Sequence, residues 1–271
     1  EDAPEEVARL LSAGIEWLHD QGVRTIVGPI DGDTWHRYRF NVGPFDRPPF
    51  LMEPYNKPYY GGLWERAGFE PLESYYSMVV DDAHAAGDSL AMIHRRVLDR
   101  GYRLRPLEVG RFDREMEVIY RLSTAIFAEN FLYEDISLDD FLAMYRPFRA
   151  LIDPELVWIA ETAEGEPVGF LFAVIDYHAA AAAMRGGDGL LARLRFLMNR
   201  RRADAVNMKS LGVLAGHRRS GLGAALACEC YYTILRKGFR RANLCLICEG
   251  NPSGRLDGGR GAVSRRYVLY Q

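Results

Sequence analysis

The sequence VLAGHRRSGLGAAL, residues 213–226, reads as the end of a strand, then a basic loop that bears glycines, then the start of an apolar helix. The first turn of a helix has backbone N–H groups without internal acceptors, and the helix dipole places positive charge there. Gly221 and Gly223 remove side chains that would keep a phosphate at a distance, and Arg218 and Arg219 add positive charge. The stretch therefore predicts a loop that binds a phosphate-bearing ligand.

The spacing of this loop excludes two common nucleotide motifs. The nucleotide P-loop needs a Lys followed by Ser or Thr after its glycines, and neither follows here. The dinucleotide fingerprint needs a third glycine where Leu226 stands. What remains is the pattern [Q/R]-x-x-G-x-[G/A], filled by Arg218, Gly221 and Gly223. This pattern resembles the pyrophosphate loop of the GNAT superfamily, the acyl-CoA-dependent N-acyltransferases; the alternative is an ordinary basic turn before a helix.

Length and composition are those of a globular protein. The 271 residues can hold one large or two ordinary domains, and 48% hydrophobic and 26% charged residues are usual values. The net charge of −3 argues against a nucleic-acid partner. The longest apolar run, residues 168–175, suits a buried strand, so no membrane partner is expected. The acidic start is unlike a signal peptide and lacks an initiating Met, so we expect the chain to begin inside a longer polypeptide.

The four cysteines are Cys228, Cys230, Cys245 and Cys248, a spacing that suggests a zinc site. However, residues two apart on a helix point about 200° apart, and the second pair lies on opposite faces of an expected strand. We therefore expect buried free thiols, no metal and a reducing, cytoplasmic location.

The second part of the chain predicts one complete α/β (α+β) unit. The expected elements are a strand at 103–108, helices at 114–129 and from Ser137, strands at 156–161, 167–175 and 205–213, a helix at 222–237, and strands at 242–248 and 263–270. The pair Ser137 and Asp140 resembles a capping box. The order resembles the GNAT fold, a mixed, mostly antiparallel sheet flanked by helices, and predicts a complete GNAT acetyltransferase domain at residues 101–271.

The first part of the chain repeats the later elements only in part, with a helix at 4–19, a strand at 23–30, a helix at 60–67 and a strand at 72–80. Its motifs are similar to those of bacterial tandem GNAT-like proteins: Gly28-Pro29, Trp35-His36-Arg37-Tyr38, Phe45-Asp46-Arg47-Pro48-Pro49 and Tyr55-Asn56-x-Pro58-Tyr59-Tyr60. The resemblance predicts a partial, degenerate unit at residues 1–100, with a linker at 81–101. Its acidic start, residues 1–6, would repel a pyrophosphate. The aromatic insertion at 33–54 either walls a substrate pocket or forms interdomain core; the alternative to a repeat is a coincidental α/β arrangement.

The resemblance implies acetyl-CoA as the cofactor and assigns the residues that bind it. The loop residues Arg218, Arg219, Ser220, Gly221, Leu222, Gly223 and Ala224 would hold the pyrophosphate. The backbone of Leu211, Gly212 and Val213 would bind the pantetheine amides, which requires this strand to part from the strand at 242–248. Gly212 would allow a local distortion of the strand. Asn251 would contact the pantetheine arm; the alternative is that it caps the next short helix.

The groups that would carry out the chemical step are a donor to the oxyanion, a general base and a general acid. The backbone N–H near Val213 is the usual family donor to the oxyanion. Glu249 is the expected general base, with Glu161 and Asp176 as alternatives. In the family, the general acid is usually a tyrosine on the short helix after the position of Asn251, but residues 252–259 contain no tyrosine. Tyr267 is the expected substitute, with Tyr270 as an alternative and core packing as another role for both.

The expected function is therefore transfer of an acetyl group to a primary amine of a small molecule. The alternatives are a non-catalytic CoA-binding or scaffold protein, and a peptide or protein N-acetyltransferase. The helix expected within residues 188–202 has an apolar stripe and five arginines. We expect it to pack beside the cleft, where His178 faces the acceptor; a helix on a membrane surface is the alternative. The sequence allows a homodimer without fixing the oligomeric state.

Overall fold

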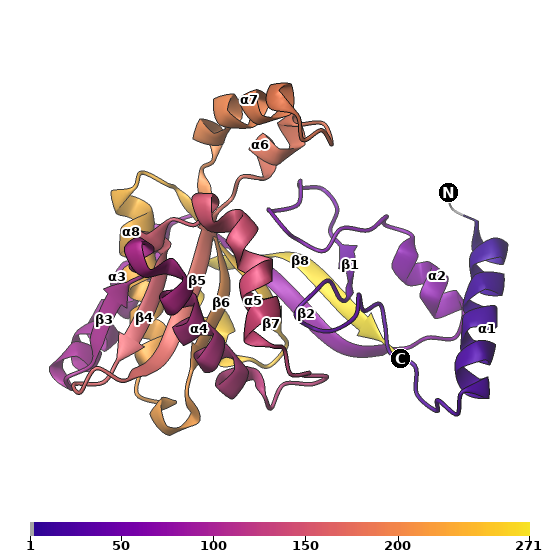
Figure 1. Cartoon of the computed structure of the whole chain (residues 1–271), viewed down its shortest axis with the longest axis horizontal. Helices are drawn as coiled ribbons and strands as arrows, with labels where there is room; N and C mark the ends of the chain where they lie inside the picture. The colour runs from indigo at the N-terminus through magenta and orange to yellow at the C-terminus, as the bar shows by residue number, and fades with distance from the viewer. Residues whose placement is uncertain (1–2) are drawn as a thin grey trace.

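The computed structural model describes residues 3–271, and its strands form one eight-stranded sheet in the order β1-β8-β2-β7-β6-β5-β4-β3 (Figure 1). The strands are β1 Phe40–Gly43, β2 Pro71–Val80, β3 Arg103–Pro106, β4 Val157–Glu161, β5 Pro167–Ile175, β6 Ala205–Val213, β7 Arg241–Cys248 and β8 Gly261–Tyr270. Among these described residues β6 and β7 pair in parallel, and the other neighbours pair antiparallel. The predicted mixed, mostly antiparallel sheet is confirmed.

Helices cover both faces of the sheet (Figure 1). They are α1 Pro4–Asp20, α2 Tyr60–Arg66, α3 Ala83–Asp99, α4 Phe112–Phe127, α5 Leu138–Tyr145, α6 His178–Ala183, α7 Leu190–Asn199 and α8 Leu222–Arg236. Alternate residues of β5 point to opposite faces, as a strand requires. Phe170 and Phe172 pack in the core under α4 and α5, whereas Leu171 and Ala173 pack in the core under α3 and α8.

Most elements of the second part lie where the sequence predicts them, because their caps and turns are explicit. The side-chain oxygen of Ser137 accepts from the Asp140 N–H at 3.1 Å and caps α5. β4 and β5 form the predicted hairpin. The predicted strand at 23–30 is wrong: only isolated bridges form there, from Gly28 to Tyr270 and from Ile30 to Tyr38.

Residues 81–101 were expected to be a linker, but they form α3, which packs along α8. Ala86 and Val97 are fully buried in this contact. A Cβ at Gly87 would lie 3.3 Å from Tyr231 Cβ, so a small residue lets the two helices approach closely. Asp82 caps the helix by accepting from the Ala85 N–H at 2.9 Å. The small residues of this segment therefore serve helix packing.

The first 100 residues share the sheet with the rest of the chain. β2 lies between β7 and β8, where Tyr75 pairs with Cys248 on one side and Tyr267 on the other. β1, which the sequence did not predict, extends the sheet beyond β8. The division into two units at residue 100 stays a prediction. Glu1 and Asp2, which belong to the acidic start, lie outside the described residues.

Helices α6 and α7 project from the end of the sheet (Figure 1). Phe196 holds α7 by an edge contact with Tyr177, and Ala192 is buried, but the predicted apolar stripe faces solvent. The exposed side chains are Leu190, Leu191, Leu194, Leu197 and Met198, and Leu190 is 89% exposed. The expectation that this stripe packs beside the cleft is wrong. Within residues 3–271, no helix combines the length and apolar character that crossing a membrane requires.

Candidate functional site

The parallel strands β6 and β7 part after a short pairing. Their register runs from Ala205 with Arg241 to Met208 with Leu244 and goes no further. β6 continues to Val213 and still pairs with β5 there, so its edge toward β7 is left without a strand partner. The parting that the sequence analysis required is present, beside the predicted pantetheine strand.

Both strands are irregular where they part: the β5–β6 register skips Lys209 of β6, and β7 is distorted at Leu246. Leu246 has a positive φ of 58°, which is unusual for a residue with a branched side chain. Its N–H donates to the Ser77 side-chain oxygen at 3.0 Å, on the side of β2. The β2–β7 register shifts at the same place, between Tyr76 and Met78. The bulge therefore turns β7 toward β2 and away from β6.

The basic loop leads from the end of β6 into α8. Gly221 caps the helix in the left-handed conformation, and the Ser220 side-chain oxygen accepts from the Leu222 N–H at 3.2 Å. Within residues 3–271, the N–H groups of Arg219, Gly221, Gly223 and Ala224 have no protein acceptor. Such free amides at a helix start form a site for an anion.

Gly221 and Gly212 have structural roles that differ from the ones expected. Gly221 has φ 93°, and a Cβ there would lie 2.7 Å from Ile93 of α3. Its role is the left-handed cap and the contact with α3, not only clearance for a phosphate. A Cβ at Gly212 would lie 2.8 Å from Ile126, so Gly212 lets α4 pack on β6 and marks no distortion of the strand. At Gly223 a Cβ would lie 3.4 Å from Leu211, an ordinary contact.

Arg218 joins the loop to the end of α4. Its Nε donates to the Val213 carbonyl at 3.4 Å and its Nη2 to the Ile126 carbonyl at 3.5 Å, while its Nη1 lies 3.6 Å from Glu129. Arg219, with φ 68°, is exposed. The charge of Arg218 is therefore held in place by its contacts, whereas that of Arg219 extends into solvent.

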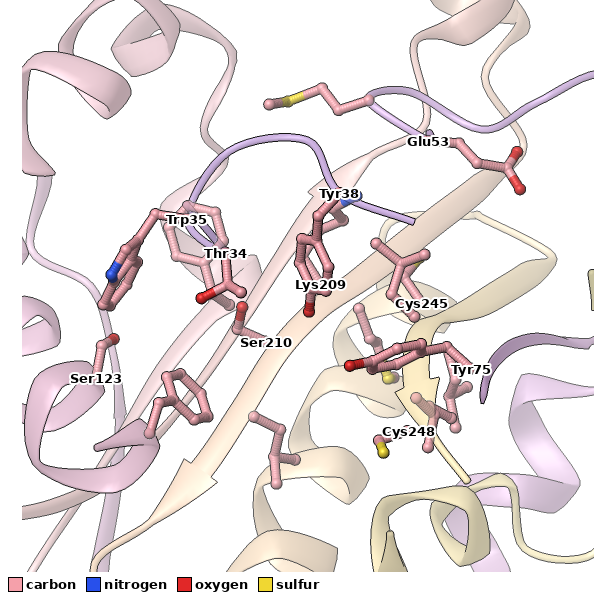
Figure 2. Close-up of a pocket in the computed structure, with 18 of the residues that line it drawn as sticks. Thr34, Trp35, Tyr38, Glu53, Tyr75, Ser123, Lys209, Ser210, Cys245 and Cys248 are labelled. Atoms are coloured by element: carbon pink, nitrogen blue, oxygen red, sulfur yellow. The ribbon is translucent and has the colours of Figure 1, made fainter. Parts of the chain in front are cut away.

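A large cavity, about 1630 Å³, opens between the parted strands. Its walls include Lys209, Ser210 and Leu211 of β6 and Cys245–Glu249 along β7 (Figure 2). Aromatic side chains make up much of the remaining lining: Trp35, Tyr38, Tyr55, Tyr75, Phe127, Phe131, Tyr133, Tyr145, Phe148, Phe170 and Phe172. The aromatic insertion thus contributes to a pocket wall, one of its two expected roles. Tyr59 and Tyr60 pack elsewhere: the two rings contact each other and Tyr60 contacts Phe40.

Comparisons with known proteins agree on the architecture. A GCN5-related N-acetyltransferase from Sphaerobacter thermophilus superposes with a TM-score of 0.51 at 20% identity, over 77% of this chain and 54% of that one. A glucosamine N-acetyltransferase region of a fungal multi-domain β-N-acetylglucosaminidase gives 0.51 at 12% identity, over 84% and 24%. The chain has the GNAT fold. No family model matches the sequence.

Two curated proteins are similar in sequence. The bacterial ceramide synthase of Caulobacter vibrioides is 25% identical over 189 residues, which cover 69% of this chain and 48% of that protein. Protein YghO of Escherichia coli is 23% identical over 190 residues, covering 68% and 47%. The chain therefore spans about half the length of the curated relatives it matches.

The expected catalytic residues occupy different places in this GNAT fold. Glu249 lines the cavity, is about half exposed, and its Oε1 lies 2.9 Å from Arg266 Nη1. Tyr267 is fully buried outside the cavity lining; its hydroxyl donates to Glu53 and lies 3.1 Å from the Ser77 hydroxyl. Burial raises the pKa of Tyr267. Of the two, Glu249 is the one with access to a bound molecule.

The three alternatives for proton transfer lie outside the cavity lining. Glu161 pairs with Arg105 at 2.7 Å near the far edge of the sheet. Asp176 accepts from the Leu51 N–H at 2.8 Å, and Tyr270 donates to Glu65 at 3.0 Å. Two other predicted residues do line the cavity: His178, expected to face the acceptor, and Asn251, whose side-chain oxygen also accepts from the Ser253 N–H at 2.9 Å. Both roles expected for Asn251 are therefore compatible with its position.

The cavity thiols are poor nucleophiles. Burial raises the pKa of Cys245 to about 12, and burial followed by the nearby Glu73 raises that of Cys248. A thiol with a raised pKa stays protonated at neutral pH, and only the thiolate attacks. Cys228, Cys230 and Cys245 are buried free thiols, as predicted.

Sequence reasoning missed a group on the β2 side of the GNAT cavity. Tyr38 and Tyr75 line this cavity together with Lys209 and Ser210 (Figure 2). The two tyrosine rings meet edge to face, and the guanidinium of Arg39 contacts both, 3.7 Å from each centroid. Burial raises the pKa of Tyr75, so its hydroxyl remains a proton donor at neutral pH. Tyr38 belongs to the aromatic insertion that was expected either to wall a pocket or to form core, whereas no pattern in the sequence distinguishes Arg39 or its contact with Tyr75.

Proposed function

We propose that the chain transfers an acyl group from acyl-CoA to a primary amine. The observation that carries this proposal is the parting of β6 from β7 beside a helix start with free amides. The loop from Arg219 to Ala224 would hold the pyrophosphate, and the open edge of β6 from Lys209 to Val213 would pair with the pantetheine arm. Asn251 would contact the same arm.

The reaction needs little from side chains. The amine nitrogen bonds to the thioester carbonyl carbon, the C–S bond breaks, and a proton from the amine ends on the departing thiol. Holding two reactants in line lowers such a barrier by roughly 7–11 kcal/mol. A backbone N–H of the open β6 edge would donate to the carbonyl oxygen. Glu249 would accept the amine proton and Tyr75 would give one to sulfur, since both residues line the cavity.

The sequence predicts an acetyl donor and a small amine as acceptor. The cavity favours a second version, with a long acyl chain or a lipid amine, because it exceeds the roughly 300–1,000 Å³ typical of small-molecule sites and its lining is mostly apolar. The similarity to a bacterial ceramide synthase supports the same version. The small-molecule version and the lipid version use the same CoA-binding loop; they differ in the acyl chain or amine that would occupy the cavity.

A thiol-release assay tests the proposal. Acyl-CoA donors from acetyl to palmitoyl are each offered with a small amine, a long-chain amine and a peptide with a free N-terminus. Release that rises with donor or acceptor chain length supports the lipid version, and release confined to acetyl-CoA supports the small-molecule version. Acyl-CoA binding without release in every combination would favour a non-catalytic CoA-binding protein. Absence of binding would contradict the proposal.

A further inference from the structure

Two arginines are buried in the described part of the chain, and they differ sharply in their partners. Arg265 is 4% exposed, and its Nε lies 3.1 Å from Glu53 Oε1. Its two other nitrogens donate to the carbonyl oxygens of Pro44 and Arg47. Arg39 is 6% exposed, and its Nε and Nη1 are buried without an acceptor.

The remaining nitrogen of Arg39 points to the cavity. Nη2 is not among the buried unpaired atoms and donates to no group within residues 3–271, while Arg39 itself lines the cavity. Neither Glu73 nor Glu249, which line the same cavity, forms an ion pair with it. The guanidinium therefore presents an unmet donor to whatever occupies this space.

The position of Arg39 is fixed before any ligand arrives. The rings of Tyr38 and Tyr75, which meet edge to face, both contact its guanidinium. Its backbone has φ 71°, a strained value for a residue with a side chain, and its N–H donates to the Pro29 carbonyl at 2.9 Å. A buried charge without an opposite charge costs stability, and contact with aromatic rings offsets only part of that cost. Strain and unpaired charge at one cavity residue indicate a functional role.

Arg39 lies on the wall opposite the pyrophosphate loop. Its neighbour Tyr75 pairs with Cys248 at the end of β7, whereas the loop follows the end of β6. Since the two strands part, these ends form different walls of the opening. A ligand held by Arg39 would therefore enter from the acceptor side.

We propose that Arg39 binds an oxyanion, a carboxylate or a phosphate, carried by the acceptor amine. The inference rests on the proposed acyl transfer and adds the acceptor class: an amine that also bears a negative charge. A planar guanidinium donates to either oxyanion with charge-assisted hydrogen bonds. Glu249 on the same side of the cavity suits the amine end of such a molecule.

Matched acceptors test the acceptor class. Ethanolamine is compared with phosphoethanolamine, and butylamine with 4-aminobutyrate, in the thiol-release assay. The wild type should favour the anionic member of a pair in kcat/KM by roughly 10- to 100-fold, the value of a hydrogen bond to a charged group. The phosphate and carboxylate pairs show which oxyanion is preferred. Equal rates within both pairs would overturn the proposal.

Variants assign the preference to Arg39. Arg39→Met should abolish it and raise KM for the anionic acceptor while leaving KM for acyl-CoA unchanged, and Arg39→Lys should restore part of it. Arg37→Met is the matched control, since Arg37 is an exposed arginine that lines the same cavity two residues away. A preference that survives Arg39→Met, or that is lost equally in Arg37→Met, would contradict the proposal.

Stability separates this role from a structural one. Removing an unpaired buried charge should leave the melting temperature of Arg39→Met unchanged or higher, whereas Arg265→Met should lower it by breaking a buried pair. Equal losses in both variants, with unchanged acceptor preference, would indicate a structural Arg39. If the wild type transfers no acyl group, the proposed function fails. The oxyanion site is then tested by inorganic phosphate and acetate, which should raise the melting temperature of the wild type more than that of Arg39→Met, in which only the loop at the start of α8 can still bind them; equal rises would overturn the oxyanion site.

Discussion

Met208 on β6 and Leu244 on β7 form the last pair between the two parallel strands, and beyond them the strands separate. The separation is stabilised from the β2 side, where Ser77 accepts from the Leu246 N–H and also lies 3.1 Å from the Tyr267 hydroxyl. The buried Tyr267, expected as a catalytic acid, is thus part of the support behind the opening. The proposed donor site depends on this support.

Ser77→Ala should destabilise the protein by about 1–3 kcal/mol, because it leaves a buried N–H without its acceptor. Chemical denaturation measures the free energy of unfolding. Ser89→Ala is the control, since Ser89 makes a local bond to the Ala86 carbonyl within α3. A loss at Ser77 no greater than at Ser89 would show that the Leu246 bulge does not need this hydroxyl.

Gly212→Ala should destabilise the protein by about 1–3 kcal/mol, the usual cost of overpacking, because the new Cβ meets Ile126 at 2.8 Å. The added variant Ile126→Ala makes room, so the double mutant should lose less than the sum of the single changes. Gly216→Ala, with no atom within 4 Å of its Cβ, serves as control. Strict additivity would refute the packing role assigned to Gly212.

Stability should fall in alkaline solution. Burial raises the pKa of Cys228 to about 11 and that of Cys245 to about 12, so both thiols stay neutral in the folded chain. The unfolded thiols ionise near pH 8.5. Their stabilising contribution is therefore present below that pH and is lost as pH rises toward 11 or 12. Melting temperatures across pH 7–11 should fall less steeply for Cys228→Ala/Cys245→Ala than for the wild type; parallel curves would contradict the assignment.

The exposed stripe of α7 predicts binding to anionic vesicles. The apolar side chains of Leu190 and Leu194 lie on the exposed helix α7, which ends at the basic run Arg200–Arg202, a combination that suits the surface of a charged bilayer. Leu190→Asp/Leu194→Asp should weaken co-sedimentation with phosphatidylglycerol vesicles by roughly tenfold or more. Leu10→Asp, a change at an exposed leucine of α1, should have no effect. Equal sedimentation of all three proteins would exclude this role.

The sequence predicts local elements well where one short stretch contains all the information. β6, the glycine loop and α8 lie within one residue of expectation, since Gly221 and Gly238 mark both ends of the helix. The place of β2 between β7 and β8 depends on residues almost 200 positions apart, which no local pattern specifies. The contact of Arg39 with Tyr38 and Tyr75 likewise joins a loop to a distant strand. The Gly212 contact appears only once α4 is placed.

Calorimetric titration of CoA tests the central claim most directly, with the wild type, Gly223→Asn and Gly223→Asp. Gly223 tolerates a Cβ, whose nearest neighbour would be Leu211 at 3.4 Å, so both variants should fold. A carboxylate at this helix start would repel the pyrophosphate, whereas the amide of similar shape would not. We expect the wild type to bind CoA most tightly, Gly223→Asn more weakly because its side chain takes up space near the phosphate, and Gly223→Asp at least roughly tenfold more weakly than Gly223→Asn. Equal binding by all three, or no binding by the folded wild type, would contradict the assignment of this loop.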